Sequence, residues 1–511
     1  MRKRQSIKGR PPATDQSDEP GLRVLHAAAE AYPLIKTGGL ADVAGALPPA
    51  QRSLGVDARL LIPGYPPVLE KLGLSGRESN AIQVGNVFGA TGIKLLRTTV
   101  PENQLPVIVI YSPWFYERPG NPYLDANGLG WRDNHFRFAL LGWVAAHIAQ
   151  GNLLGDWQPD VLHAHDWHAA LSMAYLNQHP VKTVRRIFTI HNLAYQGRFD
   201  LATGPRLMID PDLLTPQHLE FHGELSFMKA GIDGADCITT VSPTYASEIL
   251  TPAFGEGLDG MLRHHKTRLT GILNGVDADQ WNPKSDTALW STYDDKSFSQ
   301  KVKNKTELRK QVGLANMESS RPLFGVVSRL TNQKGQDLIL EAIPSLVMNN
   351  CQLVVLGAGD HGIEKAFRRY ANLHPDNISF VQGYDETLAH QIFGGADSIL
   401  VPSEFEPCGL TQLYGLRYGS VPIVRRVGGL ADTVHDVLYN QPVASGMSAA
   451  NIGNGFSFQK RSDFVPTLLR AIELYQESEL WQELAVKGMR EDHGWQHAAN
   501  EYLRLYKATA I

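Results

Sequence analysis

Short apolar or β-branched runs alternate with longer helical patterns along almost the whole chain. This alternation is typical of parallel βαβ units, because a parallel strand reaches its neighbour only through a crossover connection. The runs form two sets, and each is large enough for a doubly wound sheet of its own. The first set covers residues 22–28, 58–62, 107–111, 160–165, 186–190, 237–241 and 269–273, and the second covers 323–328, 352–356, 378–381, 398–401 and 421–424. We therefore expect an α/β protein with two Rossmann-like domains.

The length of the chain agrees with two domains, because 511 residues are too many for one ordinary hydrophobic core. Residues 277–296 are rich in Asp, Trp, Pro and Ser without a clean period, so we place the interdomain crossing there. The expected N-terminal domain then covers 22–276 and the C-terminal domain 297–484, while 485–511 continue a helical pattern that no strand follows. Ligands of open α/β sheets bind beyond the carboxyl ends of the strands, so we expect the site in a cleft between the two sheets.

Composition excludes several classes of partner. The net charge is −4 with acids and bases interspersed, which argues against a nucleic-acid or anionic-membrane partner. The longest apolar region, 138–148, is shorter than a membrane span and predicts a buried amphipathic helix. The 3 cysteines form no CxxC pair, which favours free thiols in the cytoplasm. Residues 1–21 contain no hydrophobic segment, so we expect a disordered tail rather than a signal peptide.

A glycine motif, Lys36-Thr-Gly-Gly-Leu-Ala-Asp42, follows the first apolar run and precedes a helical pattern. A strand, a glycine turn and a helix start place backbone N–H groups beside a lysine, which suits a diphosphate. The alternative is an ordinary turn with a solvated lysine. The motif recurs near the other end of the chain as Arg426-Val-Gly-Gly-Leu-Ala-Asp432, which favours a role for both copies at one cleft. Lys36, Gly38, Gly39 and Asp42 are therefore candidate site residues.

Two cations, Arg329 and Lys334, follow the run 323–328 and precede the next helical pattern. Cations five residues apart at a strand end can hold a diphosphate between them, and the alternative is a pair of surface cations. Tyr384, after the run 378–381, offers an aromatic ring on which a nucleotide base can stack, with an ordinary core or surface tyrosine as the other interpretation.

Glu406 lies between the run 398–401 and the start of a helical pattern, so that Gly409, Leu410 and Thr411 present N–H groups to an anion. The Glu406 carboxylate either caps that helix or interacts with a sugar, by accepting hydroxyl hydrogen bonds or by opposing positive charge at a sugar carbon.

Three histidines, His163, His165 and His168, follow one another within six residues at the end of the run 160–165, and His191 with Asn192 ends the next run. Such a cluster invites a metal site, but it lacks the i, i+4 helical spacing and a Cys or Glu partner. A polar pocket with Trp167 as a face for sugar stacking is the better interpretation, and we expect no metal.

These motifs together resemble the bacterial glycogen synthase and plant starch synthase family, the retaining glucosyltransferases that use ADP-glucose and have the GT-B fold. The resemblance runs from about Leu22 to Tyr506. Its most specific segments are 36–42, 163–168, 189–197, 240–245, 272–277, 328–335, 406–412 and 428–432. It implies that the last helix returns to the N-terminal domain.

The resemblance also implies roles for single residues. Lys36 contacts the ADP-glucose phosphates from the N-terminal side, while Arg329 and Lys334 hold them from the C-terminal side. Glu406 lies beside the transferred glucose, and His191 lies next to its anomeric carbon. The remaining implied substrate contacts are Tyr116, Asp166, Trp167, Asn192 and Asn274, Tyr384 at the adenine, and Cys408, Gly409, Leu410 and Thr411 in the donor pocket.

The expected function is transfer of glucose from ADP-glucose to glycogen or a malto-oligosaccharide, with retention and without a metal or cofactor. The chain departs from the family pattern at Glu404, where arginine is usual, and at Val427, where threonine is usual. Two alternatives stand beside this expectation: an inactive glucan-binding homologue, and a GT-B enzyme that uses UDP-glucose. The sequence leaves a homo-oligomer open.

Overall fold

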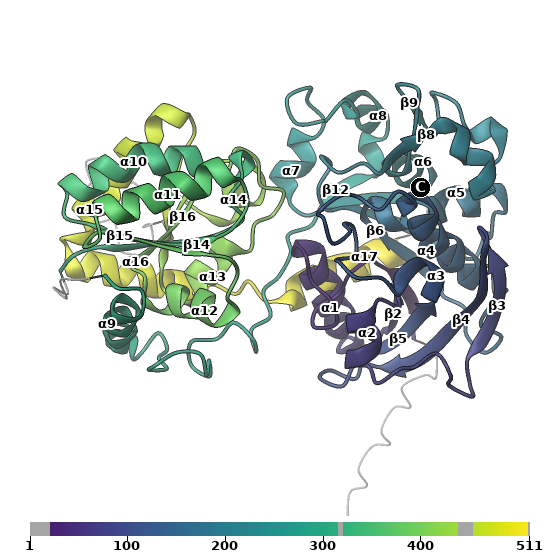
Figure 1. Ribbon diagram of the computed structural model, residues 1–511, viewed down its shortest axis with the longest axis horizontal. Coiled ribbons are helices and arrows are strands. Elements are labelled where there is room, and N and C mark those ends of the chain that lie inside the picture. The colour runs from purple at the N-terminus through teal and green to yellow at the C-terminus, as the bar shows by residue number, and fades with distance from the viewer. Residues whose placement is uncertain (1–20, 315–319, 438–452, 509–511) are drawn as a thin grey trace, which may run out of the picture.

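Residues 21–314, 320–437 and 453–508 are described by the computed structural model, and they form two α/β lobes joined side by side (Figure 1). The N-terminal lobe holds a sheet of order β12-β11-β7-β6-β1-β2-β5-β4-β3. Its strands are β1 Arg23–Ala27, β2 Asp57–Pro63, β3 Ile82–Val87, β4 Ala90–Thr99, β5 Pro106–Tyr111, β6 Val161–His165, β7 Arg185–Ile190, β11 Cys237–Thr240 and β12 Leu269–Gly271. All seven expected runs of this half are strands, and they pair in parallel.

Two parts of this lobe were not expected from the sequence. The hairpin β3–β4 adds an antiparallel edge to the parallel sheet. A small second sheet consists of β8 Arg198–Asp200, β9 Glu220–Phe221 and β10 Glu224–Ser226. These elements escape pattern analysis because β3 is half exposed and the strands of the small sheet have only two or three residues, too few for an apolar run.

Helices cover both faces of the N-terminal sheet (Figure 1). They are α1 Gly39–Arg52, α2 Pro66–Lys71, α3 Pro113–Tyr116, α4 Asn134–Ala149, α5 Asp166–Gln178, α6 Phe227–Gly234, α7 Pro243–Glu248 and α8 Asp259–His264. Helix α4 contains the apolar region 138–148, but it is buried on nearly every face rather than amphipathic. The reason is its contact with α5: a Cβ on Gly142 would lie 2.8 Å from the backbone N of Ser172, so the two helices approach closely. Among the described residues, no helix has the length and apolarity needed to span a bilayer.

The C-terminal lobe holds a six-stranded parallel sheet of order β15-β14-β13-β16-β17-β18. Its strands are β13 Leu323–Val327, β14 Gln352–Gly357, β15 Ile378–Gln382, β16 Ser398–Val401, β17 Val421–Arg425 and β18 Phe456–Phe458, of which only the three-residue β18 was not expected. Its helices are α9 Lys301–Gln311, α10 Gln336–Met348, α11 His361–Leu373, α12 Glu386–Gly395, α13 Thr411–Arg417, α14 Gly428–Thr433, α15 Phe464–Tyr475 and α16 Ser478–Arg490. Two Rossmann-like lobes thus make up the fold, as expected.

The last helix, α17 Trp495–Lys507, returns to the N-terminal lobe, where Trp495, Ala498 and Tyr502 pack with Val43 and Leu47 of α1. The expected domain boundary after residue 484 is too early. Helix α16 still belongs to the C-terminal lobe, because Leu484 and Ala485 lie in its core, and the chain crosses at 491–494.

The first crossing is also shorter than the expected 277–296. From Trp281 onward the segment packs on the C-terminal lobe: the Trp281 ring stacks on His390 and Tyr414, with ring centroids 3.9 and 3.8 Å apart. The two crossings run together, since the Val276 N–H donates to the His493 carbonyl at 2.7 Å. The tail 1–20 lies outside the described residues, and Cys237, Cys351 and Cys408 are free thiols, as expected.

We expect Gly275→Ala to weaken the docking of α17. A Cβ at this position would lie 2.7 Å from the backbone of Trp495, so one crossing must move away from the other. Thermal and urea denaturation should show a loss of about 1–3 kcal/mol, the usual cost of forcing atoms into a packed site. Gly155→Ala is the matched control, since a Cβ there has no neighbour within 4 Å. Equal stability of the two variants would contradict this account.

Candidate functional site

An ion pair joins the loops that follow β13 and β16 in the C-terminal lobe. Lys334 Nζ lies 2.5 Å from Glu406 Oε2, and Ser403 Oγ donates to the same oxygen at 2.9 Å. The two charged side chains are only 19% and 10% exposed. The loops meet because β13 and β16 are neighbours in the sheet. The structure therefore brings together Lys334 and Glu406, which the sequence had assigned to a phosphate and to a sugar, while Arg329 stands exposed in the same loop as Lys334.

The second glycine motif packs directly on the Glu406 loop. A Cβ on Gly428 would lie 1.9 Å from the Glu406 carbonyl oxygen, and one on Gly429 would lie 2.1 Å from that of Cys408. Gly428 also has φ +43°, in the left-handed region that favours glycine. Both glycines are thus required so that helix α14 can support the backbone that carries Glu406.

In the first glycine motif, two of the backbone N–H groups, those of Thr37 and Gly38, already have a protein acceptor, and the binding of a diphosphate by this motif stays a prediction. The Glu30 carboxylate accepts from Thr37 N at 2.5 Å, from Thr37 Oγ1 at 2.6 Å and from Gly38 N at 3.3 Å. Lys36 instead pairs with Asp42 at 2.7 Å and is exposed at the start of α1, next to the exposed Gly39. Glu30 lies three residues after the end of β1, so its place after a predicted strand was the available signal.

The second motif also holds a protein carboxylate, and this one comes from the other lobe. Glu248, at the end of α7, accepts from Gly428 N at 3.0 and 3.1 Å. Asp432 in turn accepts from Thr244 N at 2.9 Å and Thr244 Oγ1 at 2.6 Å. Glu248 is far in the sequence from the glycine motif that it contacts, so no sequence pattern indicated this residue. These bonds tie the two lobes together along one side of the cleft.

Asp166 follows β6 on the N-terminal side of the cleft, in the left-handed region with φ +60°. Its carboxyl group accepts from Trp167 N at 2.8 Å. Burial raises the pKa of Asp166 to about 8, against the smaller opposing effect of that hydrogen bond. At neutral pH the protonated acid predominates, so Asp166 can donate a hydrogen bond to a ligand.

His191 and Asn192 follow β7, beside Asp166. His191 is 8% exposed, and its Nε2 lies 3.1 Å from His165 Nδ1. Burial lowers the pKa of His191 to about 3, so the ring is neutral. Asn192 is half-buried, and its Oδ1 accepts from Ala194 N at 3.1 Å. This wall of the cleft is therefore polar but carries little charge.

Two expected substrate contacts are packed into the protein instead. Tyr116 is 1% exposed, and its hydroxyl donates to the Arg137 carbonyl at 2.6 Å, so it belongs to the core. Trp167 packs edge-on against Phe138, and a Cβ on Gly197 would lie 2.2 Å from its ring. Because Gly197 covers a face of that ring, the expected face for sugar stacking is occupied.

The remaining expected residues come from both lobes. Asn274, on the first crossing, is 9% exposed beside Cys408, and burial raises the pKa of the Cys408 thiol to about 12. Gly409 has φ +73° and leads through Leu410 into α13, which begins at Thr411. Tyr384 is 69% exposed at the turn after β15. Nearby, Gln280 Nε2 donates to Tyr32 Oη and to Glu386 Oε1, both at 2.9 Å, and so links the lobes.

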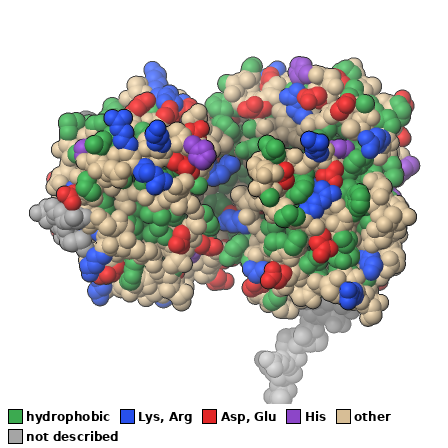
Figure 2. All heavy atoms as spheres, in the orientation of Figure 1, with side chains coloured by type: hydrophobic (Ala, Val, Ile, Leu, Met, Phe, Trp, Pro, Cys, Tyr) green, Lys and Arg blue, Asp and Glu red, His purple; other side chains and the backbone are tan. Residues whose placement is uncertain are grey.

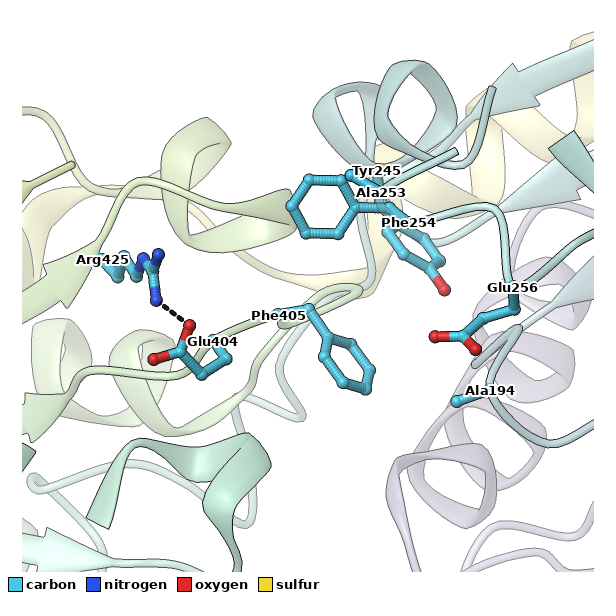
Figure 3. A pocket seen from close by; sticks show the side chains of 8 residues that line it. All are labelled: Ala194, Tyr245, Ala253, Phe254, Glu256, Glu404, Phe405 and Arg425. Atoms are coloured by element: carbon cyan, nitrogen blue, oxygen red, sulfur yellow. Dashed lines mark hydrogen bonds and ion pairs between the residues drawn. The ribbon is translucent and has the colours of Figure 1, made fainter. Parts of the chain in front are cut away.

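A cavity of about 250 Å³ lies between the lobes and borders this site (Figure 3). No residue in the predicted site set lines it, although Ala194 and Phe405 are close in sequence to Asn192 and Glu406. Its walls combine aromatic rings with carboxylates: they are Ala194, Tyr245, Ala253, Phe254 and Glu256 of the N-terminal lobe and Glu404, Phe405 and Arg425 of the C-terminal lobe. Figure 2 shows the hollow between the lobes, with Lys and Arg side chains beside it.

The two departures from the family pattern have local explanations. Glu404 pairs with Arg425 at the edge of the cavity (Figure 3). It also pairs with Arg461, so its carboxylate is neutralised. Val427 precedes α14 and is 6% exposed in the core, and the N–H of Gly428 that follows it is satisfied by Glu248.

Comparisons with known proteins agree with this geometry. Residues 23–264 match the family described as starch synthase catalytic domain, and residues 305–442 match glycosyl transferases group 1. Glycogen synthase of Serratia proteamaculans is 47% identical over 95% of this chain and 99% of its own length, and that of Leptothrix cholodnii is 46% identical over 96% and 100%.

Solved structures give the same result. The catalytic domain of starch synthase IV from Arabidopsis thaliana, bound to ADP and acarbose, has a TM-score of 0.84 at 33% identity and covers 95% of this chain and 99% of its own. Sucrose-phosphate synthase from Thermosynechococcus elongatus, at 15% identity and a TM-score of 0.56, shares the fold. Two Rossmann-like lobes around a cleft of this kind define a GT-B glycosyltransferase. Within that class, the chain belongs to the glycogen synthase and starch synthase family.

We expect the stability of the wild-type chain to fall, relative to Asp166→Asn, as pH rises from about 4 to about 8. The folded chain keeps the Asp166 proton up to a pKa of about 8, whereas an unfolded aspartate loses it near pH 3.9, so ionisation opposes folding over this interval. Above about pH 8 the difference should become constant. Urea unfolding at several pH values measures it, with Asp212→Asn at an exposed position as control. Parallel curves for the wild type and Asp166→Asn would show that Asp166 is ionised.

Proposed function

We propose that the chain transfers glucose from ADP-glucose to the non-reducing end of an α-1,4-glucan, with retention of configuration. The observation that carries this proposal is the ion pair of Lys334 with Glu406 at the interlobe cleft, since the reaction needs a cation for a diphosphate beside a carboxylate for a sugar. The binding of ADP and acarbose to the related starch synthase IV domain supports the same pair of ligands.

The charges of the C-terminal lobe suit a departing diphosphate. Negative charge grows on ADP as the glycosidic bond breaks, and Arg329 and Lys334 oppose it from the loop after β13. Lys36 adds a cation from the N-terminal lobe, where it is exposed and pairs with Asp42. We propose that these three cations replace the charge of a metal ion, so that no metal or cofactor is needed.

The groups around the sugar are of a different kind. Glu406 opposes the positive charge that develops on the glucosyl unit, and Ser403 keeps its carboxylate oriented. Neutral His191 and protonated Asp166 offer hydrogen bonds without adding charge. The Cys408 thiol stays protonated and is not a nucleophile. We infer that the acceptor attacks the face that ADP leaves and that a phosphate oxygen takes its proton.

The acceptor glucan approaches through the interlobe cavity beside Phe405. Aromatic faces and carboxylate acceptors, which line this cavity, are the groups that a sugar ring and its hydroxyls require. The free thiols of the described residues suit the reducing cytoplasm, where we place the enzyme.

Turnover with two nucleotide sugars tests this function. With glycogen as acceptor, ADP release from ADP-glucose should exceed UDP release from UDP-glucose by at least about tenfold in kcat/KM, a difference of about 1.4 kcal/mol in transition-state binding. Comparable or greater use of UDP-glucose would assign a different donor. Absence of turnover with both, together with retained glycogen binding, would favour the inactive glucan-binding homologue.

We expect Glu406→Ala to lower kcat by at least about a hundredfold while ADP-glucose still binds, because the carboxylate acts mainly on charge that exists in the transition state. Steady-state kinetics and calorimetric titration with ADP-glucose separate these effects. Glu341→Ala, at an exposed position on α10, controls for the loss of a carboxylate elsewhere. Near-normal turnover of Glu406→Ala would remove Glu406 from the catalytic residues.

A further inference from the structure

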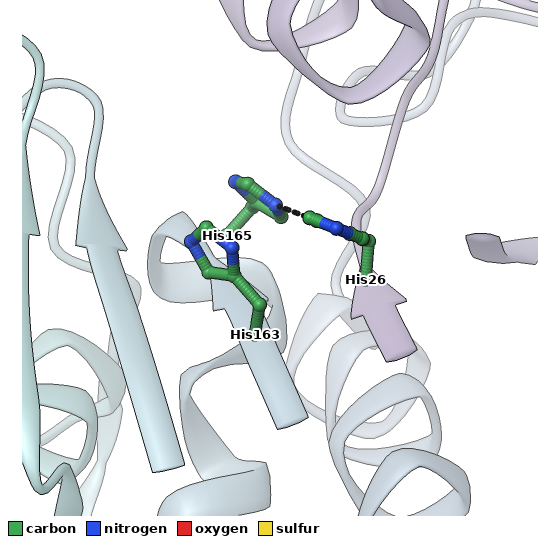
Figure 4. Close-up of side chains that lie close together, drawn as sticks. All are labelled: His26, His163 and His165. Carbon is green, nitrogen blue, oxygen red and sulfur yellow. Dashed lines mark hydrogen bonds between the residues drawn. The ribbon is translucent and has the colours of Figure 1, made fainter. Parts of the chain in front are cut away.

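A continuous chain of hydrogen bonds runs from Gln51, on α1, to His191 at the cleft. Gln51 Oε1 lies 2.8 Å from His26 Nε2, His26 Nδ1 lies 3.1 Å from His165 Nε2, and His165 Nδ1 lies 3.1 Å from His191 Nε2. Figure 4 shows the contact between the His26 and His165 rings. Gln51, His26 and His165 are fully buried, so no water competes for these bonds.

The chemistry of these groups assigns each proton. An amide oxygen only accepts, so His26 Nε2 carries a proton and donates to Gln51. A neutral imidazole has a single N–H, so His26 Nδ1 accepts from His165 Nε2, and His165 Nδ1 then accepts from His191 Nε2. Burial keeps all three rings neutral: it lowers the pKa of His26 to about 4, that of His191 to about 3 and that of His165 well below its usual value. The chain therefore leaves His191 Nδ1 without a proton.

A second branch holds the Gln51 amide in this orientation. Gln51 Nε2 donates to Tyr506 Oη at 3.0 Å, and Tyr506 Oη lies 2.7 Å from His163 Nδ1. His163 Nε2 lies 2.6 Å from Thr189 Oγ1, and Thr189 Oγ1 lies 2.5 Å from Thr239 Oγ1. Tyr506 lies on α17, so the returning helix takes part in the network that ends at His191.

The same histidines could instead hold a metal ion, since the ligand atoms of His26, His163 and His165 lie within 4.8 Å of one another among the described residues. However, both nitrogens of each ring already have a protein partner in the network. A metal would have to displace these bonds, and it would leave Gln51, Tyr506 and Thr189 buried without them. The hydrogen-bonded network accounts for every ring nitrogen of the cluster, and the metal does not.

We propose that Gln51 is a positioning residue that acts through His26 and His165 to hold His191 in the Nε2–H tautomer. His191 then offers Nδ1 as an acceptor for a hydroxyl of the transferred sugar. This step rests on the proposed function, which places His191 beside that sugar. The tautomer itself is a property of the free protein.

The test combines a spectrum with kinetics on the full-length chain. NMR of protein with isotope-labelled histidine distinguishes protonated from unprotonated ring nitrogens, and the signals of His191 are those lost in His191→Ala. The wild type should show His191 protonated at Nε2 only, and Gln51→Met should show a mixture of tautomers. An Nδ1–H tautomer in the wild type would overturn the proposal, whether or not Gln51→Met folds, and so would a metal ion bound at one equivalent after dialysis.

Kinetics show whether the tautomer matters for turnover. Gln51→Met should lower kcat about tenfold with the KM for ADP-glucose changed less than about twofold, because a misplaced proton affects the reacting complex more than donor affinity. In a His191→Ala background the same substitution should change kcat less than about twofold, since residues of one network are not additive. An equal loss in both backgrounds would mean that Gln51 acts by another route and would overturn the proposal.

Two further variants separate this role from a general effect of the substitution. Gln51→Glu should retain kcat within about threefold, because a buried, protonated carboxyl group keeps an acceptor for His26 and a donor for Tyr506. Gln352→Met makes the same change at a fully buried glutamine of β14 and should leave kcat unchanged. A loss with Gln51→Glu as large as with Gln51→Met would contradict the tautomer. The spectrum needs no substrate, so a chain that shows the Nε2–H tautomer but does not use ADP-glucose would refute the proposed function alone.

Discussion

The cleft depends on one partly buried ion pair, Lys334 with Glu406. Two desolvated charges at 2.5 Å stabilise each other only while both are present, because either one alone would face the cost of burial. The backbone geometry that holds them is equally restrictive. A Cβ on Gly335 would lie 2.1 Å from the Pro402 carbonyl, and one on Gly428 would lie 1.9 Å from the Glu406 carbonyl. The site is therefore built from the loops that follow three strands, β13, β16 and β17, and glycine allows these loops to approach closely.

The two copies of the glycine motif show how one local sequence serves different purposes. Each copy starts a helix, and in each copy a glutamate side chain accepts hydrogen bonds from backbone N–H groups at the helix start. A carboxylate is favourable there because a helix N-terminus has unpaired N–H groups and a partial positive charge. In the N-terminal lobe that glutamate is Glu30 of the same lobe, whereas in the C-terminal lobe it is Glu248 from across the cleft. The second copy thereby becomes a contact between lobes, reinforced by Asp432 with Thr244. Motion of one lobe against the other must break or re-form these bonds.

Local pattern was enough to predict most of the fold and part of the site. Parallel strands that are buried on both faces appear in the sequence as apolar runs. The residues that follow such runs gather at one edge of the sheet, so Lys334 and Glu406 could be assigned to one cleft. Tyr116 and Trp167 could not be placed, because nothing local distinguishes an aromatic ring in the core from one on a cleft wall. Glu248 accepts a hydrogen bond from Gly428, and Gln51 donates one to Tyr506. In both bonds the partners lie more than a hundred residues apart in the sequence, so only the folded chain shows that they meet. The short strands of the small sheet leave no period to detect.

Burial also divides the chemistry of the cleft between its two walls. On the N-terminal wall it removes charge: it raises the pKa of Asp166 and lowers those of His165 and His191, so that their neutral forms predominate. On the C-terminal wall, Lys334 and Glu406 form an ion pair. A diphosphate is stabilised by cations, whereas sugar hydroxyls need donors and acceptors of fixed direction rather than net charge. The cations of the cleft therefore suit the diphosphate, and the neutral groups of the N-terminal wall suit the sugar hydroxyls. For the neutral wall, the position of each proton determines whether a group donates or accepts, and this is the property that the buried network from Gln51 controls.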